Sequence, residues 1–228
     1  MKLGKYSFGI GDRFGHQGKA QLAALMKAKE AGVDVTPVWN KSYREHSIIG
    51  TKPGDVREEA DAAVAACGWN GPYFVDADHI GLSNVDQFIE ASDFFTLDVA
   101  DFIGRPAEKA HVDAFVAKHA KLIGTLEIEG IGKAFEVGEA DLKVLAAKYL
   151  AAVKEAGKIY RRIESKKGAG QFVTEVSMDE TDLPQTPIEM LVILAAIADE
   201  GSPAQPVAPK FITGSEVPSA LLSNTSMV

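Results

Sequence analysis

The chain has 228 residues, of which 46% are hydrophobic and 25% are charged, and its formal net charge is −8. This composition is typical of a globular protein whose core needs no disulfide or structural metal, and the acidic balance excludes a basic nucleic-acid-binding face. The single cysteine excludes an intrachain disulfide and a Cys-rich zinc module. The sequence shows neither a signal-peptide pattern at its start nor an apolar run of about 18 residues, so we expect a cytoplasmic protein with no membrane or nucleic-acid partner.

Short apolar, β-branched or aromatic runs alternate with longer runs of helical periodicity. In chain order the pattern predicts a strand at 5–10, a helix at 17–31, a strand at 34–39, a polar loop, a helix at 55–67, a strand at 73–76, a helix at 84–91 and a strand at 94–97. It continues with a helix at 108–121, a weaker strand at 125–128, a helix at 139–166 interrupted near Gly157, a strand at 172–177, a helix at 187–200 and a strand at 205–211.

Alternating strands and helices at this spacing predict βαβ units and a parallel sheet with buried strands. The α/β class leaves two architectures open, a doubly wound sheet and a parallel (β/α)-barrel of the TIM type. A closed barrel needs eight strands, so we expect residues 1–211 to form an incomplete barrel. Residues 212–228 carry one charge and no periodicity, and we expect an irregular or disordered tail there.

Polar residues cluster where the predicted strands end, which is where ligands bind in parallel α/β sheets. The residues at these ends are Asp12 and Arg13; Asn40, Lys41 and Arg44; Asp76, Asp78 and His79; Asp98 and Asp101; Glu175; and Lys210. Sequence motifs for other chemistries are absent: there is no GxxxxGK[ST], GxSxG or HExxH, and Gly9-Ile10-Gly11 lacks the third glycine of a dinucleotide turn.

Two acidic positions carry the chemical argument. In Asp76-Ala77-Asp78-His79 two carboxylates and an imidazole leave a buried strand together, which suits a general base beside a divalent metal; the alternative is a helix-capping Asp and an exposed His. Glu175 interrupts an apolar strand, which predicts either a tuned acid or base or an interior ion pair. Arg13, Arg44 and the two lysines, Lys41 and Lys210, are candidates to neutralise an anionic substrate.

Several blocks of the sequence resemble the tagaturonate epimerase family. They include GIGDRFGHQGKAQLAALMKAKEAG, GPYFVDADHIGL, FFTLDVADFIG and FVTEVSMDETDLPQTPIEMLVILAAIA, and the resemblance extends over most of residues 4–210. It implies a barrel-type fold and an isomerase that interconverts tagaturonate and fructuronate in hexuronate catabolism, with a divalent cation (Zn, Mn, Ni or Fe) as cofactor. Some relatives act on the neutral ketohexoses fructose and tagatose, so a sugar acid or a ketohexose is the expected small-molecule partner.

The resemblance also implies roles for individual residues. Asp78 is expected to accept a proton, His79 to bind the metal and Glu175 to act as the partnering acid. Substrate contacts are predicted for Asp12, Arg13, Lys41 and Lys210, while Asp76 or Asp12 stays open as an alternative base. Because the inverted carbon lies β to the ketone, retro-aldol cleavage and re-addition would reach it where simple enolisation cannot.

The sequence departs from the family pattern in length, since members are considerably longer and their C-terminal portion supplies further histidine ligands. We therefore expect this chain to hold only part of the site. The alternatives are an inactive partial-barrel fragment and a sugar-acid-binding module without turnover. A partial barrel exposes an unpaired sheet edge, which predicts self-association into a homo-oligomer.

Overall fold

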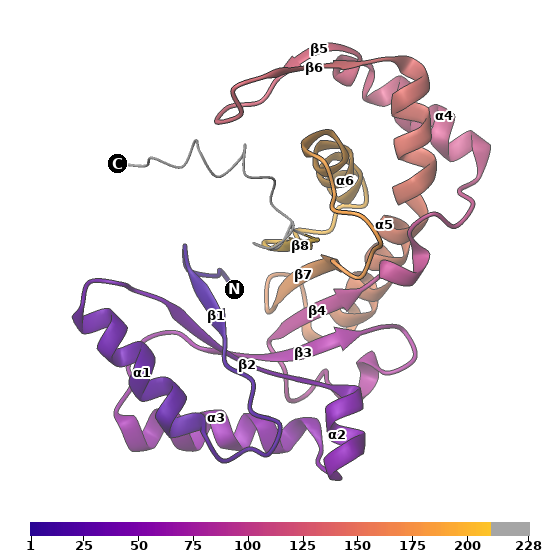
Figure 1. The fold of residues 1–228 in the computed structure, drawn as a ribbon. Coiled ribbons are helices and arrows are strands. Elements are labelled where there is room, and N and C mark those ends of the chain that lie inside the picture. Colours follow the sequence, from indigo (N-terminus) through magenta and orange to yellow (C-terminus); the bar gives the residue numbers. More distant parts are fainter. Residues whose placement is uncertain (211–228) are drawn as a thin grey trace.

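Six parallel strands form the central sheet in the computed structural model, which describes residues 1–210. The strands are β1 (Ser7–Gly9), β2 (Thr36–Ser42), β3 (Phe74–Ile80), β4 (Phe94–Asp98), β7 (Val173–Met178) and β8 (Val207–Pro209), in the spatial order β1-β2-β3-β4-β7-β8. A doubly wound sheet would reverse its strand order at a switch point, and this order does not reverse. Figure 1 shows the sheet curling from β1 to β8. The α/β class and the parallel sheet are confirmed, and the doubly wound alternative is removed.

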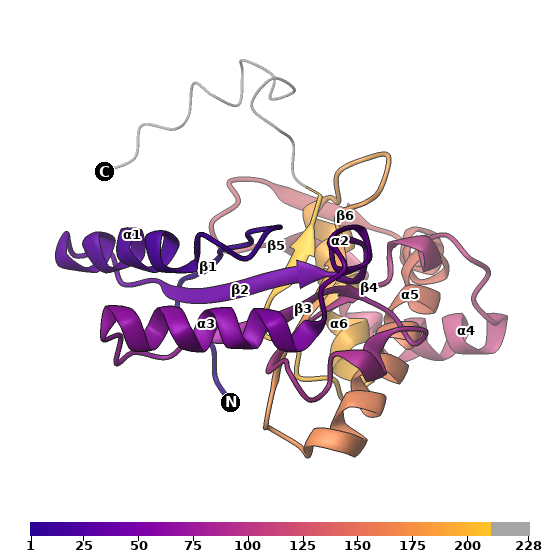
Figure 2. The ribbon, with the colours of Figure 1, turned by 90° about the horizontal axis from the view of Figure 1, so that it is seen from below.

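Helices cover the convex outside of this curled sheet. They are α1 (Gly18–Glu30), α2 (Tyr43–Ile49), α3 (Pro53–Cys67), α4 (Lys109–Lys118), α5 (Glu139–Lys167) and α6 (Pro187–Asp199), with short 3₁₀ turns η1 (Val85–Gln87), η2 (Ala100–Phe102) and η3 (Ala120–Leu122). Helices α1 and α3 pack on each other beside β2, and α5 packs between α4 and α6 (Figures 1 and 2). None of the helices within residues 1–210 combines the length and apolar character needed to cross a bilayer.

The core lies mainly between the outer face of the sheet and its helices. Phe95, Val176, Ile159 and Ile193 are fully buried where β4 and β7 meet α5 and α6. Burying a side chain of this kind contributes about 1.5–3 kcal/mol. A second cluster, which includes Trp39 of β2, forms where α1 and α3 cover the first strands. The helices therefore pack against the outer face of the strands, and no helix covers the inner face within the described residues.

The inner face changes character along the strands. Near their amino ends it is apolar, with Val38, Phe74, Phe94 and Val173 forming a small cluster against which Leu3 packs. Side chains alternate between the two faces of a strand, so every second residue beyond this cluster also faces inward. Those following residues are polar, and they meet at the carboxyl edge of the sheet.

The predicted strand at 125–128 forms, but outside the central sheet. It is β5 (Gly124–Glu127), which pairs antiparallel with β6 (Ala134–Val137) in a separate hairpin. Its residues are exposed or half-buried, and only Leu126 among them is apolar. Such a strand cannot replace the buried, nearly continuous apolar strands of a parallel sheet.

Two predicted helical features were wrong. The segment 84–91 contains only the single turn η1, because its connection is short and its apolar residues Val85 and Phe88 are buried at the core instead of lying along a helix. Helix α5 runs through Gly157 without a break. A Cβ at Gly157 would lie 2.6 Å from Glu200 Oε2, so the glycine allows the close passage of the Glu200–Arg161 pair.

Candidate active site

A cavity of about 490 Å³ opens at the carboxyl edge of β2, β3 and β4. The side chains that matter for its chemistry are Arg13, Asn40, Arg44, Asp78, His79 and Asp98. Strand register explains why residues so far apart in sequence meet here: Asn40 pairs with Asp76, Ser42 with Asp78, Thr96 with Glu175 and Asp98 with Ser177. The prediction that polar strand ends converge is therefore confirmed for these strands.

A glycine just after the first strand makes room for this inner face. A Cβ at Gly11 would lie 3.0 Å from Asn40 Oδ1, and one at Gly9 would lie 3.4 Å from the same atom. The distance at Gly11 is tight, whereas the one at Gly9 is an ordinary van der Waals contact, so it is Gly11 that makes room for the Asn40 side chain on the inner face. The Gly9-Ile10-Gly11 motif serves close strand packing in this chain.

Asp76 is the most deeply buried acid of the inner face, 6% exposed. Its Oδ1 accepts a hydrogen bond from the Thr96 backbone N–H at 3.1 Å, and its Oδ2 accepts one from the Thr96 hydroxyl at 2.9 Å. Burial, with Asp78 nearby, raises the pKa of Asp76 well above its ordinary value. Asp76 thus joins β3 to β4 and lies below the cavity, which favours a structural role over the alternative of a proton acceptor.

Asp78 on β3 and Glu175 on β7 lie on the same inner face, on either side of β4 and further toward the carboxyl edge than Asp76. Burial raises the pKa of Asp78, while His79 and a hydrogen bond from the Asn40 side chain lower it. Burial also raises the pKa of Glu175, and the charge of Asp78 adds to that effect. No ion pair of Glu175 forms within the described residues, so the interior ion-pair alternative is not seen there. Two coupled carboxyls of this kind suit sharing one proton, as a general acid and base require.

His79 holds a strained position between two acids. Its φ of 51° is the only positive φ among the non-glycine residues 1–210, and the register between β3 and β4 shifts at this point. Its Nδ1 lies 3.7 Å from Asp98 Oδ2 and its Nε2 lies 3.9 Å from Asp78 Oδ1. Contact with Asp98 raises the pKa of His79 to about 9, and Asp78 adds to this although burial opposes it. Strain of this kind gathers at functional sites.

The predicted divalent metal has no complete ligand set in the part of the chain that the structure describes. No group of three His, Cys, Asp or Glu side chains in residues 1–210 has a geometry that could hold a metal ion. His79 contacts a carboxylate through each ring nitrogen, and a metal ligand must offer one of them as a free lone pair. The described residues alone therefore do not fit a metal, and the metal stays a prediction that needs ligands from elsewhere.

Of the four predicted substrate contacts, only Arg13 lines the cavity. Asp12 accepts hydrogen bonds from the backbone N–H groups of residues 14, 16 and 17 and orders the loop before α1. Lys41 pairs in register with Ala77, which packs into the outer core, and it is 3% exposed on that outer side near Glu59. Lys210 donates to the backbone oxygens of Thr181 and Asp182, so it fastens the loop between β7 and α6.

Sequence reasoning named the strand ends and gave Arg44 only a general role in neutralising an anionic substrate, and it gave no role to Asp98 or Thr96. Arg44 lines the cavity from α2, Asp98 pairs with His79, and Thr96 holds Asp76. Asp98 and Arg44 stand at predicted strand ends, so that signal was available in the sequence. Thr96 lies inside an apolar strand, where only the register reveals its partner.

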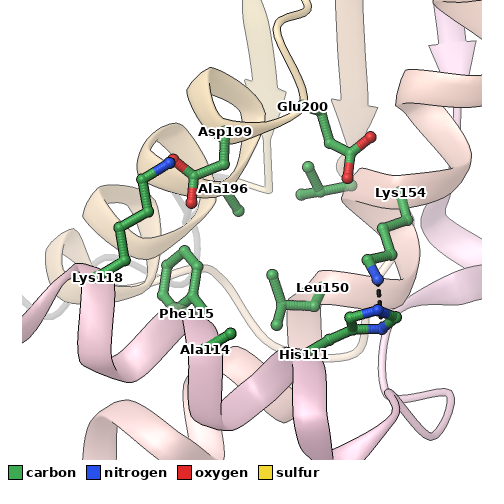
Figure 3. Close-up of a pocket in the computed structure, with 10 residues that line it drawn as sticks. His111, Ala114, Phe115, Lys118, Leu150, Lys154, Ala196, Asp199 and Glu200 are labelled. Carbon is green, nitrogen blue, oxygen red and sulfur yellow. Dashed lines mark hydrogen bonds and ion pairs between the residues drawn. The ribbon is translucent and has the colours of Figure 1, made fainter.

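A second cavity, of about 170 Å³, lies on the outside of the molecule between α4, α5 and α6 (Figure 3). Its walls include the apolar side chains of Phe115 and Leu150. Its charged groups are already engaged, since Lys118 pairs with Asp199 at 2.7 Å and Lys154 contacts His111. It lies away from Asp78 and Glu175, so the cavity at the strand ends is the better candidate active site.

Known proteins resemble this chain over nearly its whole length. The sequence model of the tagaturonate epimerase family UxaE matches residues 1–216. A tagaturonate/fructuronate epimerase from Thermotoga maritima is 27% identical over 218 residues, which cover 90% of this chain and 44% of that protein. The fold is similar to two crystal structures of the fructuronate-tagaturonate epimerase UxaE from Cohnella laeviribosi. The glycerol complex has a TM-score of 0.74 at 21% identity, and the native structure 0.70 at 23% identity.

The match covers only part of each relative, because the chain spans 44% of the Thermotoga maritima protein and 44% of the Cohnella laeviribosi chains. The family model, by contrast, covers well over half of the present chain. The resemblance drawn from the sequence blocks is thereby confirmed, and the chain belongs to the tagaturonate epimerase family.

Proposed function

We propose that this chain carries the acid–base half of an epimerase site that interconverts D-tagaturonate and D-fructuronate. The observation that carries the proposal is that Asp78 lines a cavity at the carboxyl edge of the sheet and shares the inner face with Glu175, and that burial raises the pKa of both. Membership of the family supports the substrate class. The proposal includes the finer fold assignment, in which the curled sheet is part of a (β/α)-barrel, and a cytoplasmic role in hexuronate catabolism.

The chemistry is a retro-aldol cleavage followed by aldol re-addition. Ionised Asp78 accepts the proton of the hydroxyl on the inverted carbon, the bond between that carbon and its neighbour α to the ketone breaks, and an aldehyde and an enediolate form. Protonated Glu175 donates to the enediolate oxygen that derives from the ketone. The aldehyde rotates and the same bond re-forms on its other face. Glu175 takes back its proton as the ketone re-forms, and Asp78 returns its proton to the new alkoxide, which gives the epimer.

Arrangement of the two carboxyls supports these opposite roles. Two carboxyls that share a buried inner face disfavour ionising together, and burial with this coupling raises the pKa of both, which favours one of them as the proton donor. Because the two carboxyls interact, their pKa values are properties of the pair as a unit. A divalent metal would add Lewis-acid stabilisation of the enediolate. Since residues 1–210 do not complete a metal site, no step above depends on one.

The test is turnover in D₂O, followed by proton NMR of the sugar acid. Because the chain is proposed to carry only half of the site, it is supplied with the C-terminal part of a family member and with Mn²⁺ or Zn²⁺. We then expect conversion of tagaturonate to fructuronate, abolished in Asp78→Asn, with no deuterium on the inverted carbon. Deuterium at that carbon would show direct proton abstraction and refute the retro-aldol step. Absence of turnover together with retained sugar-acid binding would replace the proposal by the binding-module alternative.

A further inference from the structure

Charge is unevenly distributed over the walls of the candidate active site. The strand walls carry acids, with Asp78 on β3 and Asp98 on β4. A second part of the lining, formed by the loop after β1 and by α2, carries Arg13 and Arg44 together with Glu45. Within the described residues these two arginines are the permanently charged cations that line the cavity. The two arginines of the cavity are therefore gathered on the part formed by α2 and the loop after β1, away from the strand ends that carry Asp78 and Asp98.

Local structure fixes this part of the lining. Glu45 belongs to a capping box at the start of α2, in which its Oε2 accepts hydrogen bonds from the Ser42 backbone N–H at 3.0 Å and from the Ser42 hydroxyl at 3.2 Å. The other oxygen of Glu45 lies 3.5 Å from Arg13 Nε. Arg13 is thus held loosely by one edge of its guanidinium, and the remaining N–H groups stay available.

Arg44 is the less committed of the two arginines. It is exposed, and no ion pair or hydrogen bond of its guanidinium forms within residues 1–210. An arginine with free N–H groups at the rim of a cavity is suited to bind a carboxylate through two parallel hydrogen bonds. Lysine offers no such planar fork. Lys41 and Lys210, which lie away from the cavity, are therefore not needed to bind a carboxylate in this way.

We propose that Arg44, assisted by Arg13, binds the carboxylate of the sugar acid and so determines both its orientation and the preference for a uronate over a neutral ketohexose. The inference rests on the proposed function and extends it. A hexuronate carries its carboxylate at the chain end, a short distance from the hydroxyl that Asp78 deprotonates. With the carboxylate on the α2 wall, the sugar carbons extend toward β3 and β7. The reverse orientation would bring the carboxylate against Asp78 and Asp98, which is unfavourable for like charges.

The test is calorimetric binding of tagaturonate and of the neutral ketose tagatose to the 228-residue chain. We expect Arg44→Met to weaken tagaturonate binding about 10- to 100-fold, the range for loss of charged hydrogen bonds. Binding of tagatose should change less than about 2-fold, because it has no carboxylate for the arginine to bind. Arg44→Lys should recover only part of the loss, since it restores charge without the fork.

The matched control is Arg161→Met, because Arg161 lies on α5 and, among the residues that the structure describes, pairs only with Glu200 at 3.1 Å. It should leave both affinities unchanged, and circular dichroism should show that each variant keeps the fold. The inference would be overturned if Arg44→Met lost affinity for tagaturonate and tagatose equally. It would also be overturned if the wild-type chain bound the two sugars equally well, or bound neither. The proposed turnover is measured separately. An active wild-type protein with no preference for the uronate would refute the role of Arg44 and leave the proposed epimerase function standing.

Discussion

Replacing Glu189 by Gln should remove a pH-dependent part of the stability. Glu189 lies at the start of α6, and its side chain is 10% exposed. Its Oε1 accepts hydrogen bonds from Lys148 Nζ and from the Tyr149 hydroxyl, both at 2.7 Å, and its Oε2 accepts one from the Thr186 backbone N–H, also at 2.7 Å. Although burial opposes it, these hydrogen bonds lower the pKa of Glu189 from 4.5 to about 2. They stabilise the ionised carboxylate, and folding therefore gains from them.

The magnitude follows from the two pKa values. A difference of about 2.5 pH units corresponds to about 3 kcal/mol. Because the folded pKa lies below the unfolded one, this stabilisation is complete above pH 4.5 and is lost as the pH falls through 2. At pH 3 the same relation leaves about 1.4 kcal/mol. The free-energy difference of unfolding between wild type and Glu189→Gln should thus shrink by about 2 kcal/mol from pH 7 to pH 3.

Urea unfolding at several pH values between 3 and 7 measures this difference. The control is Glu139→Gln, because Glu139 also begins a helix, α5, but is 61% exposed and pairs only with Lys143. An exposed pair of this type contributes about 0.3–0.5 kcal/mol, so the control should show little pH dependence. A Glu189→Gln difference that stays constant with pH would refute the reasoning, since it would mean that the carboxylate charge is not what the contacts stabilise.

Three further predictions concern the inner face of the sheet. Asp78→Asn and Glu175→Gln should each lower turnover of tagaturonate about 10²- to 10⁴-fold with the fold kept, measured by NMR and circular dichroism, and full activity in either would remove that residue from the mechanism. Thr96→Val deletes the hydroxyl that donates to buried Asp76, and it should lower the free energy of unfolding in urea by about 1–3 kcal/mol. A change under about 0.5 kcal/mol would mean that another donor replaces this hydrogen bond. His79→Val should be at least about 1 kcal/mol less stable than His79→Asn in the same assay, because Asn tolerates the left-handed backbone and a β-branched residue does not; equal stabilities would argue against the strain.

The sequence predicted the middle of the sheet well because β3, β4 and β7 are mostly buried on both faces. Such strands read as continuous apolar runs, and the runs at 94–97 and 172–177 became β4 and β7 nearly unchanged. Helix α2 was missed and taken as a polar loop, although Ser42 and Glu45 form the S-x-x-E spacing of a capping box. Its apolar content is too small for periodicity to show, so only the cap could have revealed it. The predicted irregular tail at 212–228 lies outside the described residues.

Only part of the candidate site could be predicted from the sequence. Strand ends are visible from the pattern of runs, which is why Asp78, His79 and Glu175 were found. The face on which a side chain lies depends on a period of two, and a one-residue change reverses it. Lys41 illustrates this: it sits at a predicted strand end, yet it follows Asn40 by one residue and therefore points outward into the helices. Arg44, three residues after Lys41 in the chain, reaches the cavity because α2 turns it back.

The bulge at His79 shows what alternation alone could not predict. In a regular strand the residue after Asp78 would point to the outer face, into the helices that cover β3. The left-handed backbone at His79 and the register shift against β4 break this alternation, and the imidazole reaches Asp98 on the inner side. A strained residue persists only where its surroundings hold it, and here two carboxylates do so. The strain therefore favours a functional role for His79 at this position, whether or not that role is to bind a metal.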